Sequence, residues 1–175
     1  MKIHNFVIAI AGAASLGATA IGVPGASAAA SPPQAKTSDL RIWLGESDGA
    51  AGSVYYPLNF KNISGHTVTI RGYPGVSAIT KSGRQLGNAA AWESDFPKKT
   101  VTLRKGATAH TVVRLVHGVF GNQKMVTAYG FRIYPPNQTR SKIIRCSFEA
   151  LAKKGTTYLF VMGPIRPGVG THGSL

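Results

Sequence analysis

The sequence predicts an all-β protein, an antiparallel, immunoglobulin-like β-sandwich of eight or nine short strands. Three observations support this fold class. Apolar and polar residues alternate within short segments, which is the period of a strand with one buried face. Turn residues recur roughly every ten positions, a spacing typical of sandwiches and barrels. No helix long enough to connect parallel strands is apparent, which argues against a parallel sheet.

The alternating segments give the predicted strands. In chain order they are 40–44, 54–61, 67–71, 76–80, 100–104, 107–117, 126–134, 142–146 and 157–162. Pro57 removes one backbone donor from the second of them and favours a sheet edge or a bulge for it. Residues 85–99 lose the alternation and predict a long loop, and residues 148–155 are compatible with a brief helix. Sequence order alone does not say which sheet each strand joins.

The segment 62–76 reads as a polar turn, a short strand and then a Gly72-Tyr73-Pro74-Gly75 corner. Proline fixes its own φ and restricts the preceding residue to extended conformations, so the corner is stiff. We interpret it as chiefly architectural, with Tyr73 packed over an end of the sandwich.

The amino terminus has the layout of a secretory signal peptide. Lys2 precedes an apolar run, and Ala26-Ser27-Ala28 supplies a small-x-small cleavage site after Ala28. We therefore divide the chain into a signal peptide (1–28), a linker (29–37), a β-sandwich domain (38–163) and a flexible tail (164–175). The mature protein is expected to be secreted, without a further transmembrane span, and either free or associated with the cell envelope.

The chain is strongly basic, with a formal net charge of +14. Cleavage of the predicted signal peptide would remove Lys2, leaving 19 basic and 6 acidic residues and a formal net charge of +13. Such an excess favours an anionic polymer or membrane surface as partner, although charge also serves solubility alone. The predicted strands place Arg and Lys opposite their apolar faces, at Arg41, Lys61, Arg71, Arg104, Arg114 and Arg132. The densest basic region is the candidate anion-binding set Arg140, Lys142, Arg145, Lys153 and Lys154.

Several segments together resemble a family of secreted actinobacterial proteins known as domain of unknown function 4232. They are Asp39-Leu40, 49–53, 58–62, Ser64-Gly65, 72–76, Gly83, 101–103 with Gly106, and 130–136, and they span about Asp39 to Met162. The resemblance implies an exported β-sandwich domain with no assigned activity, so it supplies no catalytic residues. It also implies cysteines near Thr37, Val68 and Gln123 that this chain lacks, which leaves Cys146 without its expected partner.

No catalytic, metal or cofactor site is predicted. His110 and His117 are seven residues apart and would face opposite sides of one strand, and no Gly-x-Ser-x-Gly elbow exists. Two alternatives to a binding module remain. One is a hydrolase acting on polysaccharide or ester through the loop 92–96, which carries Glu93 and Asp95. The other is a self-associating structural protein that pairs through the candidate free thiol, Cys146.

Overall fold

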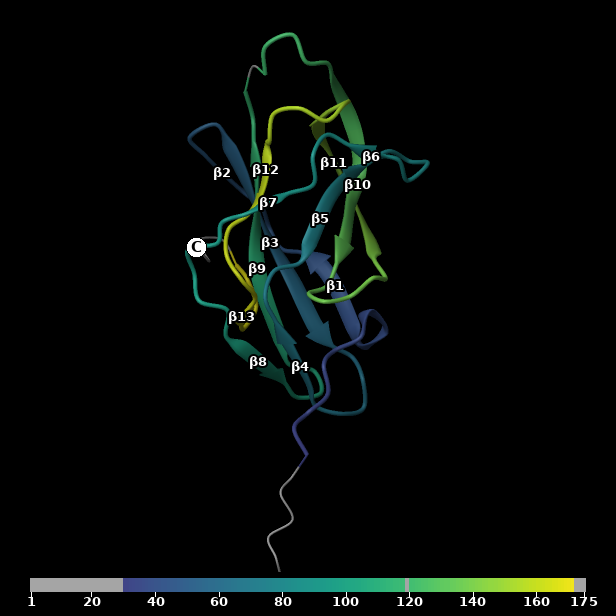
Figure 1. The fold of residues 1–175 in the computed structure, drawn as a ribbon, viewed down its shortest axis with the longest axis vertical. Helices are drawn as coiled ribbons and strands as arrows, with labels where there is room; N and C mark the ends of the chain where they lie inside the picture. Colours follow the sequence, from purple (N-terminus) through teal and green to yellow (C-terminus); the bar gives the residue numbers. More distant parts are fainter. Residues whose placement is uncertain (1–29, 119, 172–175) are drawn as a thin grey trace, which may run out of the picture. The chain divides into compact units, whose positions relative to one another are not determined.

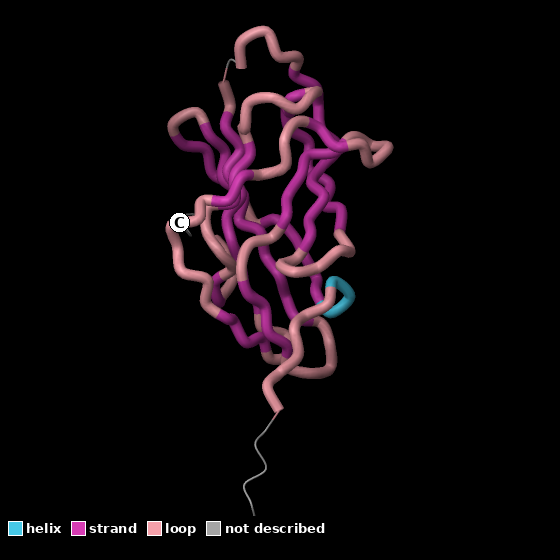
Figure 2. The backbone as a smooth tube through the Cα atoms, viewed as in Figure 1, coloured by secondary structure: helices cyan, strands magenta, loops and turns pink. Residues whose placement is uncertain are grey.

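The protein is described by a computed structural model, which covers residues 30–118 and 120–171. Within these ranges the fold is all-β, with no α-helix, as predicted (Figure 1, Figure 2). The described residues form thirteen strands in three mostly antiparallel sheets. The predicted signal peptide, residues 1–28, lies outside the described residues. No helix in the described part of the chain is long and apolar enough to cross a membrane.

A short 3-10 turn, η1 (Thr37–Asp39), precedes the strands. They are β1 (Leu40–Leu44), β2 (Asp48–Ala50), β3 (Ser53–Asn62), β4 (Val68–Arg71), β5 (Gly75–Ile79), β6 (Gln85–Leu86), β7 (Ala91–Trp92), β8 (Thr100–Leu103), β9 (Thr108–Val116), β10 (Met125–Tyr134), β11 (Lys142–Leu151), β12 (Leu159–Val161) and β13 (Arg166–Pro167). The predicted number of strands was too low because β2, β6, β7 and β13 have only two or three residues each. Strands this short show no recognisable alternation of apolar and polar residues.

The largest sheet has the order β1-β3-β9-β12-β7, with β2 added to β3 and β13 to β9. All its pairs are antiparallel except β12 with β7. Strand β3 therefore lies inside the sheet, and the edge position favoured by Pro57 was wrong. The Pro57 carbonyl accepts from Gly45 N at 2.7 Å, so it points away from β9, towards the residue just beyond the end of β1. The missing donor faces the same side as that carbonyl, so the ladder with β9 keeps its bonds.

The second sheet, in the order β11-β10-β5-β6, packs against the first through a shared apolar core. The ring of Phe131 in β10 meets Tyr56 of β3 edge-on at 5.7 Å and stacks on Phe148 at 4.4 Å. Phe148 belongs to β11, so the brief helix considered for 148–155 was wrong at its start. Phe148 and Ala150, two residues apart, both point into the core, and this spacing is the side-chain period of a strand.

The linker and tail predicted from composition differ from the structure. Gln34 forms a bridge with Thr69, and Ala35 donates its backbone N–H to the Thr69 carbonyl, so these residues extend the small β4–β8 sheet. At the other end β13 pairs with β9, and Gly170 N donates to Asn59 Oδ1 at 2.8 Å. The described parts of these segments, 30–37 and 164–171, are therefore held to the sheets by hydrogen bonds of backbone groups, which need no recognisable side-chain pattern. Residues 29 and 172–175 lie outside the described residues.

Candidate anion-binding site

The corner between β4 and β5 forms one wall of a pocket. Gly72 has a φ of +102°, a region that L side chains rarely adopt, so glycine is needed there. The next residue, Tyr73, is 5% exposed and donates its hydroxyl to the Glu93 carbonyl at 2.6 Å. Burial, followed by the nearby Asp95 and Glu93 carboxylates, raises the pKa of Tyr73. Tyr73 is thus packed into the fold, as the architectural interpretation of the corner expected.

Trp92 lies against this corner and faces solvent. Its ring stacks on Tyr73 with centroids 5.4 Å apart and planes 20° apart. Its indole N–H donates to the Pro74 carbonyl at 3.1 Å, which fixes the ring's orientation. Trp92 nevertheless stays 52% exposed, so a large aromatic surface is held in place without being covered.

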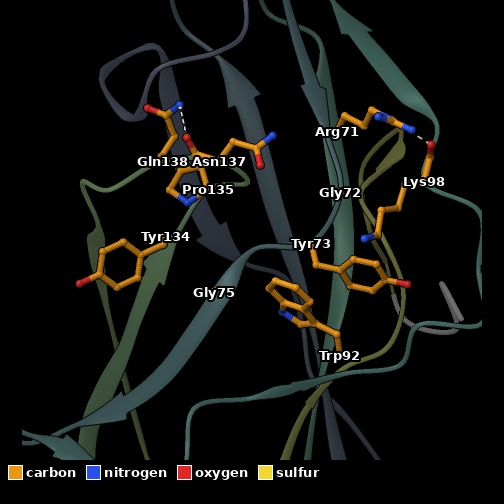
Figure 3. A pocket seen from close by; sticks show the side chains of 10 residues that line it. All are labelled: Arg71, Gly72, Tyr73, Gly75, Trp92, Lys98, Tyr134, Pro135, Asn137 and Gln138. Carbon is orange, nitrogen blue, oxygen red and sulfur yellow. Dashed lines mark hydrogen bonds between the residues drawn. The ribbon is translucent and has the colours of Figure 1, made fainter.

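Two cationic side chains line the pocket: Lys98 lies next to the Tyr73 ring, and Arg71 lies next to Lys98 (Figure 3). The Lys98 ammonium lies 5.6 Å from the Tyr73 ring centroid, within cation–π range. Arg71 Nε donates to the Lys98 carbonyl at 3.1 Å, which ties the two residues together. Tyr134, Pro135, Asn137 and Gln138 form the opposite side. We call this cavity of about 500 Å³ the corner pocket; its ten lining residues are Arg71, Gly72, Tyr73, Gly75, Trp92, Lys98, Tyr134, Pro135, Asn137 and Gln138, none of them acidic.

A second depression, of about 590 Å³, shares Gln138 with the corner pocket. We call it the hydroxyl pocket; it is lined by Lys36, Thr37, Ser38, Gln138, Thr139, Arg140, Ser141 and Lys142. Its rim is fixed by the amino-terminal segment, since Thr37 donates to the Arg140 carbonyl at 2.8 Å and Gln34 to that of Pro136 at 3.2 Å. Asp39, nearby, lines neither pocket and accepts from Lys36 N at 2.8 Å.

The five basic residues singled out from the sequence do not form one patch. Arg140 and Lys142 line the hydroxyl pocket. Arg145 lies within β11, with its guanidinium 5.4 Å from the Tyr129 ring centroid. Lys153 and Lys154 follow the far end of β11, a strand of ten residues and therefore about 30 Å long. Closeness in sequence failed to give closeness in space because an extended strand separates the residues.

The sequence profile of a family described as Domain of unknown function (DUF4232) matches residues 35–160. The chain belongs to this family. The resemblance found in the sequence is thereby confirmed. No curated protein matches the chain.

The matched region of this DUF4232 domain begins at Ala35, inside the segment that composition had suggested to be a linker. It includes the residues that line both pockets. Lys36, Lys98 and Gln138 were missed as site residues by sequence reasoning. The Lys98-Lys99 doublet close to Trp92 was the one available signal, while nothing in the sequence marked Gln138 as the residue shared by two depressions.

The carboxylates of the loop 92–96 do not line either pocket of the DUF4232 domain. Glu93 Oε1 forms an ion pair with Arg114 Nη2 at 3.2 Å, and the Arg114 guanidinium lies 4.5 Å from the Phe160 ring centroid. Glu93 thus neutralises a cation on the outer face of β9. Among the described residues no group of three or more His, Cys, Asp or Glu side chains could hold a metal ion.

Cys146 of the DUF4232 domain is half-buried on the inner side of β11 beside Tyr56. Burial raises the pKa of the thiol, partly opposed by its hydrogen bond with Tyr56. Burial also raises the pKa of Tyr56 to about 12, with smaller contributions from Cys146. Neither residue lines the two pockets.

Proposed function

We propose that this protein is a secreted, non-enzymatic binding module for polyanions, associating with anionic material of the cell envelope through an immunoglobulin-like β-sandwich. One observation carries the proposal. The corner pocket and the hydroxyl pocket share Gln138 and together contain five cationic side chains but no carboxylate. The cations are Arg71 and Lys98 in the first pocket and Lys36, Arg140 and Lys142 in the second.

The dimensions of the two pockets suit consecutive units of a polymer. Each has a volume in the range of roughly 300–1,000 Å³ that is typical of small-molecule sites. A polyanion lying across Gln138 would meet cations on both sides of it. Because these side chains are exposed, their attraction depends on ionic strength, and the excess positive charge of the chain speeds encounter with the polymer.

The test uses the mature chain and a fluorescein-labelled heparin oligosaccharide, with labelled dextran of matched length as the neutral probe. Fluorescence anisotropy should give saturable binding to heparin whose dissociation constant rises at least about tenfold between roughly 50 and 200 mM salt. Dextran should not bind. Salt-independent binding, or equal binding to dextran, would overturn the proposal.

A pair of double variants separates site binding from bulk charge. Arg140→Gln with Lys142→Gln removes two charges from the hydroxyl pocket, and Lys153→Gln with Lys154→Gln removes two from the far end of β11. We expect the first variant to weaken heparin binding about tenfold and the second less than about twofold, since only the first removes pocket cations. Equal losses in both would show that net charge alone attracts the polymer.

A further inference from the structure

We infer that the corner pocket is a saccharide subsite that takes one hexose ring bearing an anionic group, a phosphate or a carboxylate. The inference rests on the proposed function, because it names the ligand class at one of the two pockets. It is argued from three features of the corner pocket: a fixed aromatic surface, side-chain amides on the opposite side, and cations without counter-charges.

The aromatic surface is pre-organised for a sugar ring. Trp92 is held by the stack with Tyr73 and by its bond to the Pro74 carbonyl, yet 52% of the residue is exposed. A pyranose presents an apolar face of C–H groups and a rim of hydroxyls, so one face can pack on a flat aromatic ring while the rim stays hydrated or bonded. Because the ring is already fixed, binding costs little side-chain entropy.

The opposite side offers polar groups to the hydroxyl rim. Asn137 extends over the space between the Tyr134 and Tyr73 sides of the pocket (Figure 3). Its side-chain amide makes no hydrogen bond to the protein within the described residues and keeps both donor and acceptor capacity. Gln138 uses one donor on the Asn137 carbonyl at 3.2 Å, which leaves its amide oxygen for a ligand hydroxyl.

The cations require an anionic substituent on the sugar. Arg71 commits Nε to the Lys98 carbonyl, so its terminal nitrogens stay available for an anion. The Lys98 ammonium projects towards the Tyr73 ring (Figure 3). No acidic side chain lines the pocket to neutralise either group. Arginine and lysine together favour phosphate or carboxylate, which the experiment distinguishes.

A single-stranded nucleic acid also combines rings with phosphates, but the neighbouring pocket argues against it. Nucleic acid of this kind is bound by successive aromatic platforms that stack successive bases. The hydroxyl pocket has no aromatic residue and is lined by Thr37, Ser38, Thr139 and Ser141 beside its cations. Hydroxyl-lined walls match the next unit of an acidic saccharide better than a second base.

The experiment uses Trp92 fluorescence in a Trp43→Phe background, in which Trp92 is the remaining tryptophan. Four probes are titrated: glucose 1-phosphate, methyl glucuronide, neutral methyl glucoside and adenosine 5′-monophosphate. We expect saturable changes in emission with the phosphate or the uronide, at least tenfold weaker binding of the neutral glucoside, and no saturation with the nucleotide. A nucleotide response without a sugar response, or equal affinity for charged and neutral sugars, would overturn the inference.

Two variants keep the test independent of folding and of polymer binding in general. Trp92→Phe retains an aromatic ring, and Arg71→Gln removes a cation without removing the platform. Affinity for glucose 1-phosphate, measured by calorimetry, should fall at least fivefold in each, at unchanged melting temperature. If labelled heparin still binds with steep salt dependence while both variants bind the sugar phosphate like the parent, the saccharide subsite is wrong and the polyanion function stands. If heparin does not bind at all, the proposed function fails, whatever Trp92 reports.

Discussion

Two basic regions of the domain differ in what surrounds their charges. The corner pocket is lined by Arg71 and Lys98 together with an exposed, fixed tryptophan and side-chain amides. At the far end of β11, Lys153 and Lys154 are exposed near Lys124, whose carbonyl accepts from Ala152 N. We call these three lysines the lysine turn.

The aromatic residues near the lysine turn point inward. Tyr158 is fully buried and meets Phe120 edge-on at 6.2 Å. The Tyr158 ring therefore supports the core and presents no surface to a ligand. The comparison teaches that a run of lysines marks charge alone, whereas a site also needs exposed groups held in fixed positions.

Among the substitutions considered below, the largest effect on stability is expected at Gly87, which supports the lysine-turn end of the core. Gly87 has a φ of +61°, and an added Cβ would lie 2.6 Å from Cε1 of the buried Tyr158. Gly87→Ala should therefore lower the free energy of unfolding by about 3 kcal/mol, from overpacking and backbone strain together. Urea denaturation measures the loss. Heparin affinity of the folded fraction should stay unchanged, and a loss of affinity equal to that of the pocket variants would break the distinction between the two regions.

A smaller loss, of about 1–2 kcal/mol, is expected for Gly72→Ala. An added Cβ would meet nothing within 4 Å, so the cost comes from the φ of +102° alone. Here affinity for the sugar phosphate should fall as well, because Gly72 sets the position of Tyr73 and hence of Trp92. Parallel urea and calorimetric measurements test both expectations. Unchanged stability would mean that the corner relaxes freely and is no rigid wall.

How much could be predicted from sequence follows from the range of the underlying interactions. Alternation in segments such as 54–61 reports burial of one face, and it gave the all-β class and most of the long strands correctly. For β11 it gave only the first half, 142–146. It could not place β3 inside the sheet, because strand order depends on partners distant in sequence. The contacts of the segments around Gln34 and Gly170 were not predicted for a related reason, since the hydrogen bonds that hold them involve backbone groups and leave no side-chain pattern.

The candidate site shows the same division. Charge density singled out Arg140 and Lys142, which line the hydroxyl pocket, but grouped them with Lys153 and Lys154, which a ten-residue strand separates from them. The pocket residues come from the segments 36–38, 71–75, 92–98 and 134–142, so only the folded chain brings them together. Glycine and proline at the corner were readable because their backbone restrictions are local.

Tyr73→Phe tests the hydroxyl that anchors the corner. The variant keeps the ring and its stack on Trp92 but leaves the Glu93 carbonyl without the 2.6 Å hydrogen bond. We expect a loss of about 1 kcal/mol in the free energy of unfolding. Sugar phosphate affinity should fall less than in Trp92→Phe, because the exposed platform remains. A larger affinity loss than in Trp92→Phe would assign the recognition to Tyr73 and not to Trp92.

The smallest effect is expected at Cys146, which lies outside both pockets. Cys146→Ser replaces the half-buried thiol beside Tyr56 with a hydroxyl of similar size, so the free energy of unfolding should change by less than about 1 kcal/mol. Burial raises the pKa of the thiol and so lowers its thiolate fraction, and because disulfide formation needs the thiolate, we expect this reaction to be slow. Non-reducing gels of the wild type at pH ~7 should therefore show monomer, as should the variant. A dimer in the wild type that is absent from Cys146→Ser would instead favour self-association through this thiol. If only that dimer bound the polymer, the binding site would be assigned to the dimer and not to the pockets of the monomer.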